Sequence, residues 1–268
     1  MLAQRLGLSI NSTRPLGKWS PDDESSLEAW YQKGEGITLS GSDVSTWADS
    51  SSNSYDMLQG DAGERPAYSA GVLTFVSANT ENLQTSGANI SLSGDFTIGA
   101  KIHLATVGTL LGDNTSTGEF MRFTSATNLR IRIDNTTAVN IVKDSGTFVE
   151  DAYLVITRVS DLITLNWKGV AQADTETLSG TADIDAIGVQ RPDAQAYNGT
   201  ISEIQIYSSS SAALTANVND RLSTLKNGKY TKHKFKYNNS TSRYRSKRQG
   251  MDFLWNRRLG KSLSTVLN

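Results

Sequence analysis

The pattern of apolar and polar positions predicts β-structure from Leu27 to Tyr207. Short runs rich in Val, Ile, Thr, Phe and Tyr alternate there with clusters of Gly, Ser, Asn and Asp. Residues 129–133 read Leu-Arg-Ile-Arg-Ile, residues 96–102 have an apolar residue at every second position, and residues 201–207 form a last predicted strand. Such short segments, with no helical pattern between them, predict an all-β fold: an antiparallel β-sandwich or jelly roll. Polar residues at alternate positions predict one solvent-facing side on each sheet.

Two tight hairpins are predicted within this region. The runs at 153–159 and 162–167 are separated only by Ser160-Asp161, a two-residue connection typical of a β-hairpin. A second corner is predicted at 167–170, where Lys168-Gly169 separates Trp167 from Val170.

One helix is predicted after the last strand. Leu214, Val218, Leu222 and Leu225 follow one another at spacings of four, four and three residues, which places them on one helical stripe. The serines at 208–211 are candidate N-caps, and Asn227-Gly228 is a candidate C-cap. We expect this stripe to pack on the sandwich.

Charge divides the chain into two unequal parts. Residues 227–268 contain eleven Lys or Arg and one acid, Asp252, which gives a net charge of +10. Residues 1–226 contain fifteen Lys or Arg and twenty-six Asp or Glu, which gives −11. We therefore predict an N-terminal arm (1–24), a sandwich domain with its closing helix (25–226) and a basic C-terminal arm (227–268). An acidic domain with a basic arm indicates a chain that attaches to a partner.

The basic arm is the strongest candidate interaction site. Its cationic side chains alternate with aromatic rings, a pattern that can bind nucleic acid or an acidic protein surface. We favour a protein surface, because residues 253–255, Phe-Leu-Trp, supply an apolar anchor of the kind found at interfaces. The residues predicted to make this contact are Lys232, Lys234, Lys236, Arg243, Arg245, Lys247, Arg248, Phe253, Trp255, Arg257 and Arg258.

The residues available for catalysis or metal binding are few. The sequence contains no Cys and two His, His103 and His233, which lie far apart in the sequence. A zinc site or a Ser-His-Asp triad is therefore not expected, nor is any cofactor. Asp113 and Asn114 beside Gly112 are the only suggestion of a calcium site, and the remaining oxygen ligands cannot be placed from the sequence.

Two carboxylate pairs have part of the spacing that a β-sandwich glycosidase needs. Asp174 lies two residues before Glu176, and Asp183 lies two residues before Asp185. The pairs flank Ser179-Gly180, so they could meet across a hairpin. Neither pair is extended by a third acid, and a solvated edge hairpin is the simpler interpretation. The sequence therefore predicts a protein that is not an enzyme.

No segment of the sequence has the length and apolarity of a membrane span, and the first residues have no secretory apolar core. We expect synthesis in the cytoplasm and no contact with a membrane.

Several motifs resemble the laminin-G/concanavalin A-like jelly-roll domain in the form found in bacteriophage virion proteins. They are Leu27-Glu28-Ala29-Trp30-Tyr31, Val44-Ser45-Thr46-Trp47-Ala48-Asp49, Arg65-Pro66-Ala67-Tyr68, Gly71-Val72-Leu73-Thr74-Phe75, Asp95-Phe96-Thr97-Ile98 and Ile201-Ser202-Glu203-Ile204-Gln205-Ile206-Tyr207. The resemblance covers residues 25–226 and concerns fold more than chemistry. The family's usual ending after the Phe is replaced here by Val76-Ser77-Ala78-Asn79, which counts against a family metal or glycan site at that point.

The resemblance implies a non-enzymatic structural protein of a phage particle, a decoration, neck or tail accessory made in the host cytoplasm. Its expected partners are other virion proteins with acidic surfaces and further copies of itself, docked through the terminal arms. The alternative is a carbohydrate-binding adhesin whose loops contact host surface glycans.

Overall fold

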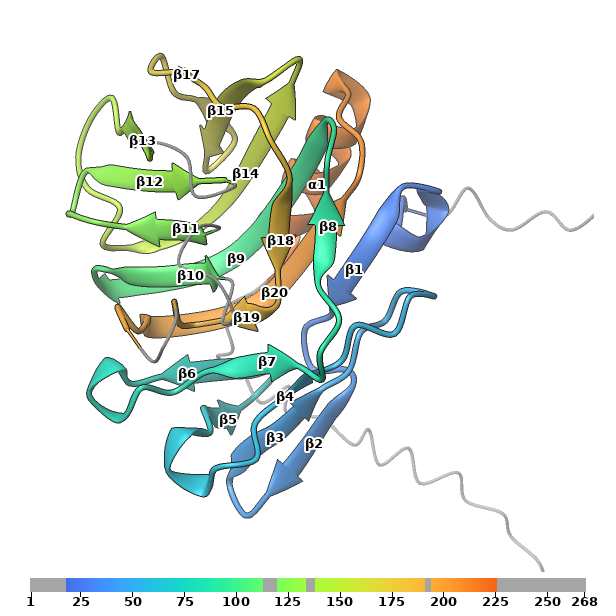
Figure 1. Cartoon of the computed structure of the whole chain (residues 1–268), viewed down its shortest axis with the longest axis vertical. Helices are drawn as coiled ribbons and strands as arrows, with labels where there is room; N and C mark the ends of the chain where they lie inside the picture. Colours follow the sequence, from blue (N-terminus) through green and yellow to red (C-terminus); the bar gives the residue numbers. More distant parts are fainter. Residues whose placement is uncertain (1–17, 113–119, 134–137, 191–193, 226–268) are drawn as a thin grey trace, which may run out of the picture. The chain divides into compact units, whose positions relative to one another are not determined.

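The computed structural model describes residues 18–112, 120–133, 138–190 and 194–225, and for Phe120 it describes the backbone alone (Figure 1). Within these residues the chain forms an antiparallel, jelly-roll-like β-sandwich followed by one α-helix. The predicted fold class is therefore confirmed. The proposed boundaries of the two terminal arms stay predictions, because residues 1–17 and 226–268 lie outside the described part of the chain.

The elements follow one another as a long series of short strands. In chain order they are η1 (Pro21–Asp23), β1 (Leu27–Tyr31), β2 (Ile37–Ser40), β3 (Asp43–Trp47), β4 (Met57–Leu58), η2 (Ala62–Glu64), β5 (Ala67–Ser69), β6 (Val72–Phe75), η3 (Ser77–Asn79), β7 (Leu83–Thr85), β8 (Ile90–Leu92), β9 (Phe96–Thr106), β10 (Gly108–Gly112), β11 (Phe120–Phe123), β12 (Asn128–Arg132), β13 (Val139–Val142), β14 (Asp151–Val159), β15 (Leu162–Trp167), β16 (Val170–Ala171), β17 (Glu176–Thr177), β18 (Ala182–Ile184), β19 (Ala186–Ile187), β20 (Asn198–Tyr207) and α1 (Ala212–Thr224).

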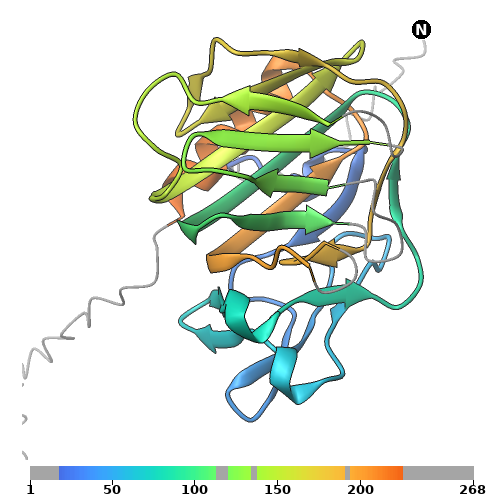
Figure 2. The same ribbon diagram turned by 60° about the vertical axis from the view of Figure 1, so that its left-hand side comes forward.

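These strands form two layers. The back sheet runs in the order β15–β14–β9–β20, and β1 and β6 share the other edge of β20. The front sheet runs in the order β13–β12–β11–β10–β19–β7 and continues through β4 to β3 and β2. Strand β5 connects the layers, because it pairs with both β3 and β6. In Figure 2 strands β10 to β13 face the viewer and α1 lies behind the sandwich.

Both predicted hairpins are confirmed. Val159 pairs with Leu162, and the intervening Ser160 and Asp161 have φ values of 49° and 67°. Positive φ at both central residues is the backbone twist that two-residue hairpin loops need. Lys168 and Gly169, with φ values of 54° and 80°, make the second corner between β15 and β16.

The core lies between the two layers. Alternate residues of the front sheet, such as Met121 of β11 and Ile131 of β12, are buried against alternate residues of the back sheet, such as Ile98 and Ile156. Strand alternation thus separates an inner apolar side of each sheet from an outer side. What covers each outer side decides where a ligand can bind.

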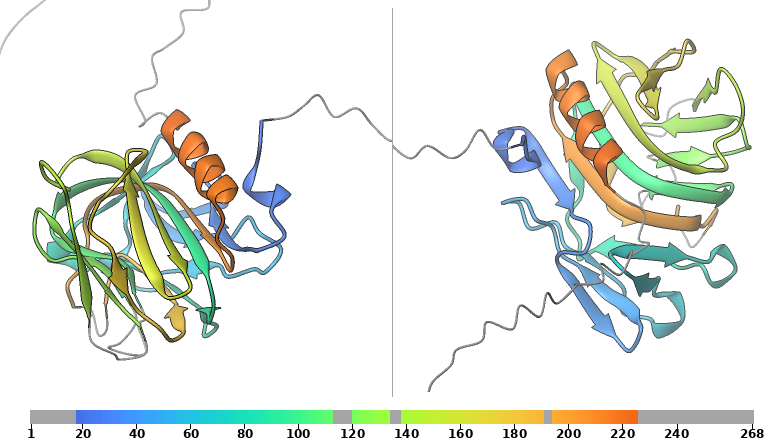
Figure 3. Two further views of the ribbon diagram at one scale, coloured as in Figure 1. Left: turned by 90° about the horizontal axis from the view of Figure 1, so that it is seen from above. Right: turned by 180° about the vertical axis from the view of Figure 1, so that it is seen from behind.

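Helix α1 covers the outer side of the back sheet (Figure 3). The Ser211 side chain accepts a hydrogen bond from the Leu214 amide at 3.0 Å, which confirms the predicted N-cap. The predicted stripe is buried against Val155 and Tyr207 of the back sheet, and its members are Leu214, Val218, Leu222 and, in part, Leu225. The helix ends at Thr224, ahead of the predicted stop, which lies outside the described residues.

Close approach of α1 to the sheet depends on Gly99 in β9. A Cβ atom at this position would collide with a methyl group of Val218 and would lie 3.1 Å from a methyl carbon of Leu222. Glycine therefore allows the helix to rest directly on the strand.

A solvent-facing outer side is the wrong expectation for β20. Ser202, Glu203 and Gln205 are buried, with exposed fractions of 2%, 0% and 0%. The cause is α1, whose Arg221 donates to the Glu203 carboxylate at 2.5 Å. The Trp30 indole donates to the same carboxylate at 3.1 Å.

A two-stranded ribbon of β8 and β18 is tied to the sandwich by a buried arginine. The Arg158 guanidinium donates to the carbonyls of Leu92, Gly94 and Gly180, and it stacks 4.8 Å from the centre of the Phe96 ring. These bonds fix segments that are far apart in the sequence. No helix in the described part of the chain is long and apolar enough to cross a membrane.

Candidate functional site

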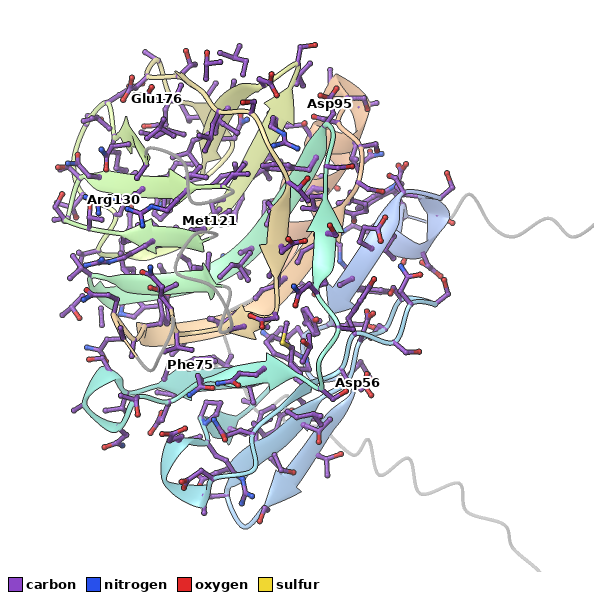
Figure 4. All side chains as sticks on the ribbon, in the orientation of Figure 1. Asp56, Phe75, Asp95, Met121, Arg130 and Glu176 are labelled. Atoms are coloured by element: carbon purple, nitrogen blue, oxygen red, sulfur yellow. The ribbon has the colours of Figure 1, made fainter. Side chains whose placement is uncertain are left out.

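The outer side of β11 and β12 carries arginines that face one another. Met121 and Ile131 point into the core, so their neighbours Arg122 and Arg130 point outward. The register places Arg122 directly opposite Arg130. Figure 4 labels Arg130 on β12 and Met121 on β11.

The row extends over four strands. Thr109 of β10 lies opposite Arg122, and Asn140 of β13 lies opposite Arg130. Arg130 Nε lies 3.4 Å from Asn140 Oδ1, so the amide orients the guanidinium. We call the row of Arg122, Arg130 and Asn140 the arginine face; Thr109 at its end is fully buried. Arg132, two residues after Arg130, also points outward.

The two arginines opposite one another repel. Like charges in directly paired positions of a sheet are destabilising. Burial, and then the charge of Arg130, lower the pKa of Arg122. Among the described residues, no acidic side chain pairs with Arg122 or Arg130, and Arg122 Nε is buried without a hydrogen-bond partner. The arginine face is thus a preorganised cationic surface on rigid strands.

Charges at the seam between the two sheets are arranged differently. Glu150 accepts hydrogen bonds from Trp167 at 2.8 Å, from Lys168 at 2.9 Å and from Lys143 at 3.3 Å. Burial alone would raise the pKa of Glu150, but these three donors outweigh it and lower the pKa to about 2. Every charge there has a partner, so the seam has a structural role.

The back of the sandwich has a groove of about 730 Å³ between α1, β14 and β15. Hydroxyl and amide side chains line it, including Thr157, Thr164 and Asn166, together with the exposed side chains of Val159 and Leu162. The Thr157 and Thr164 hydroxyls bond to each other at 2.7 Å. No lining residue is charged, so this groove lacks a group that would select an ionic ligand.

The two acidic pairs do not meet across a hairpin, which corrects that expectation. Strand β17, which contains Glu176, pairs with β15, whereas β18, which contains Asp183, pairs with β8. Asp174 accepts a hydrogen bond from the Val142 amide at 2.6 Å, and Asp185 is buried. Strand β17 precedes Gly180 and β18 follows it, and the two strands diverge because they pair with different strands. The Gly180 carbonyl accepts a hydrogen bond from Arg158.

The remaining candidate chemistry is sparse in the described residues. His103 Nδ1 lies 3.1 Å from Asp151 Oδ1 on the outer side of β9 and β14, where both side chains are partly exposed. The described residues contain no group of three or more His, Asp or Glu that could hold a metal ion. Asp113, Asn114 and His233 lie outside the described residues, as do all the predicted contact residues of the basic arm, from Lys232 to Arg258.

Sequence reasoning missed the arginine face, although part of its signal was visible. The alternation Leu-Arg-Ile-Arg-Ile already places Arg130 and Arg132 on one side of a strand. The position of Arg122 opposite Arg130 depends on the register between β11 and β12, which the sequence does not reveal.

No family model and no curated protein matches this chain. Solved structures give distant likenesses. One is domain 4 of AbnA, a GH43 extracellular arabinanase from Geobacillus stearothermophilus, in complex with arabinotriose. Its sequence identity to this chain is 14% and the TM-score is 0.48; the match covers 74% of this chain and 98% of that chain. Another is the receptor-binding domain of botulinum neurotoxin type G, with 14% identity, coverage of 74% and 51%, and a TM-score of 0.46. A third is a mutant Trypanosoma rangeli sialidase displaying trans-sialidase activity, with 13% identity, coverage of 75% and 34%, and a TM-score of 0.46.

The chain spans 24% of the length of the sialidase NanB, 34% of the Trypanosoma sialidase and 51% of the toxin domain. Likenesses this distant carry no ligand or activity over to this chain.

Proposed function

We propose that the sandwich is a non-catalytic carbohydrate-binding domain and that the arginine face is its contact surface. The observation that carries this proposal is the difference between the two outer sides. Helix α1 covers much of the back sheet, whereas β11 to β13 present outward the guanidinium groups of Arg122 and Arg130 and the amide of Asn140. Such groups donate and accept the hydrogen bonds that sugar hydroxyl and carboxyl groups need. Their position on strands rather than loops keeps the geometry fixed.

The test is a binding screen of the full-length protein against immobilised bacterial polysaccharides, both neutral and acidic. We expect saturable binding to at least one polysaccharide and weaker binding by Arg130→Gln. Absence of binding to every polysaccharide would overturn the proposal.

We propose further that the domain does not cleave its ligand. Support comes from the separated acidic pairs, because glycoside hydrolysis needs two carboxylates held about 5–10 Å apart. A reducing-sugar assay on the same polysaccharides should show no turnover. Release of sugar that is abolished by replacing Asp174, Glu176, Asp183 or Asp185 would show a depolymerase instead.

A second proposal concerns the setting of the domain. The +10 charge of residues 227–268 and their aromatic anchor favour a structural component of a phage particle, attached through this segment to acidic protein surfaces. Deletion of residues 227–268 should abolish incorporation into purified particles, measured by mass spectrometry. Normal incorporation of the shortened chain would contradict this.

The attachment is proposed to combine charge with apolar contact. Salt screens exposed charge pairs and leaves a buried ring contact almost unchanged. Trp255→Ala should therefore weaken particle binding even at low salt. If salt alone controls release and Trp255→Ala has no effect, the apolar anchor is wrong.

A further inference from the structure

We propose that the arginine face selects acidic polysaccharides, and that Arg122 and Arg130 together hold one carboxylate or sulfate group of the ligand. This inference rests on the proposed carbohydrate-binding function and adds the chemical class of the ligand. The geometry that supports it lies within two neighbouring strands.

The first step concerns the electrostatic repulsion between Arg122 and Arg130. Two guanidinium groups stand in directly paired positions, where side-chain stems are about 4.5–5.5 Å apart. No described acid neutralises either of them. An anion between them would remove the repulsion and would also accept a hydrogen bond from each side.

The second step is the number of donors left for a ligand. Asn140 accepts from Arg130 Nε, while the terminal nitrogens of Arg130 form no hydrogen bond with a described residue. The terminal nitrogens of Arg122 likewise form no hydrogen bond with a described residue. Guanidinium groups match planar carboxylates and tetrahedral sulfates with paired donors, which a lysine ammonium does not do.

The third step is the choice between polyanions. The described side chains of the arginine face include no aromatic ring, so they offer no platform for stacking bases. The Asn140 amide beside the guanidinium groups suits a chain that carries hydroxyl groups between its acids.

The experiment compares full-length wild type with Arg122→Gln, Arg130→Gln and the double variant. Lys168→Gln, in the turn between β15 and β16, is the control for loss of one positive charge away from the arginine face. The ligands are alginate for carboxylate, dextran sulfate for sulfate, unmodified dextran as the neutral polymer and single-stranded DNA as the non-carbohydrate polyanion. The basic segment 227–268 is present in every protein, so its contribution to binding cancels when the variants are compared on the same ligand.

We expect alginate or dextran sulfate to bind wild type more tightly than dextran or DNA does. Each arginine variant should weaken that binding about tenfold, the loss typical of one charged hydrogen bond, and Lys168→Gln should leave it unchanged. The stronger of the two acidic polymers identifies the acidic group.

Several outcomes overturn the inference. Binding of dextran equal to that of the acidic polymers leaves carbohydrate binding intact and removes the selectivity. Equal losses in Lys168→Gln and the arginine variants, or no loss in either, place the site elsewhere. Tighter binding of DNA than of either acidic polysaccharide rejects the ligand class, and no binding of any polysaccharide rejects the proposed function as well.

Discussion

The outer sides of β20 and β12 have similar sequence patterns but different environments. Both strands alternate apolar with polar residues, as Glu-Ile-Gln-Ile in one and Leu-Arg-Ile-Arg in the other. On β20 the charge of Glu203 is buried and met by Arg221, Trp30 and Gln205. On β12 the charge of Arg130 meets another arginine. Alternation therefore predicts which way a side chain points, and only the neighbouring elements decide whether its charge is structural or available to a ligand.

Removing Glu203 should have the largest effect on stability. Glu203→Ala leaves Arg221 without its counter-charge in a mostly buried position, which typically costs about 3–5 kcal/mol. Chemical denaturation should show this loss, while Glu35→Ala at an exposed turn should stay within about 0.5 kcal/mol of wild type. A small effect of Glu203→Ala would mean that α1 is held without this network.

Filling the space beneath α1 tests whether the helix really covers the back sheet. Gly99→Ala should destabilise the fold by about 1–3 kcal/mol, because the added methyl meets Val218. Gly94→Ala is the control, since nothing lies within 4 Å of a Cβ atom there. Equal stability of the two variants would contradict the close packing of α1.

Acid should weaken the paired charges at the seam of the sandwich. Because the folded-state pKa of Glu150 is about 2 and its ordinary value is 4.5, its stabilising contribution is complete above pH 4.5 and is lost as pH falls toward 2. After allowance for solvent screening this amounts to about 1 kcal/mol. Denaturation midpoints at several pH values should fall less for Glu150→Gln than for wild type across that window, and parallel curves would contradict the pairing.

Replacing an arginine of the arginine face should have the smallest effect and the opposite sign. Arg122→Gln removes the repulsion with Arg130 and should raise stability by roughly 0.2–1 kcal/mol, most clearly at low salt. Arg65→Gln should lower stability by about 1 kcal/mol, because Arg65 donates to the carbonyls of Gln59 and Gly60. Destabilisation by Arg122→Gln equal to that of Arg65→Gln would show that Arg122 is a structural residue.

Local rules predicted much of the fold from the sequence. The loop Ser160-Asp161 is too short for anything but a hairpin, and the spacing of Leu214, Val218 and Leu222 defines one helical face. Both features depend on residues close together in the sequence, which is why they could be predicted.

Features that depend on distant residues could not be predicted. Burial of Glu203 requires α1 to bring Arg221 against β20, and the opposition of Arg122 and Arg130 requires one particular register. The acidic pairs could have met because they are close in sequence, but β17 and β18 pair with strands on different parts of the sandwich. The predicted contact residues of the basic arm stay predictions, since residues 226–268 lie outside the described part of the chain.

The last strand of the sandwich in chain order, β20, lies between strands made much earlier. Tyr207 pairs with Thr97 of β9 on one edge and with Leu27 of β1 on the other. Contacts between residues so far apart in sequence form slowly, because a long loop must close before any pairing is gained. During synthesis, the edges of β1, β6 and β9 that pair with β20 therefore stay unpaired until residues 198–207 leave the ribosome. Folding of the back sheet is consequently a late event in synthesis.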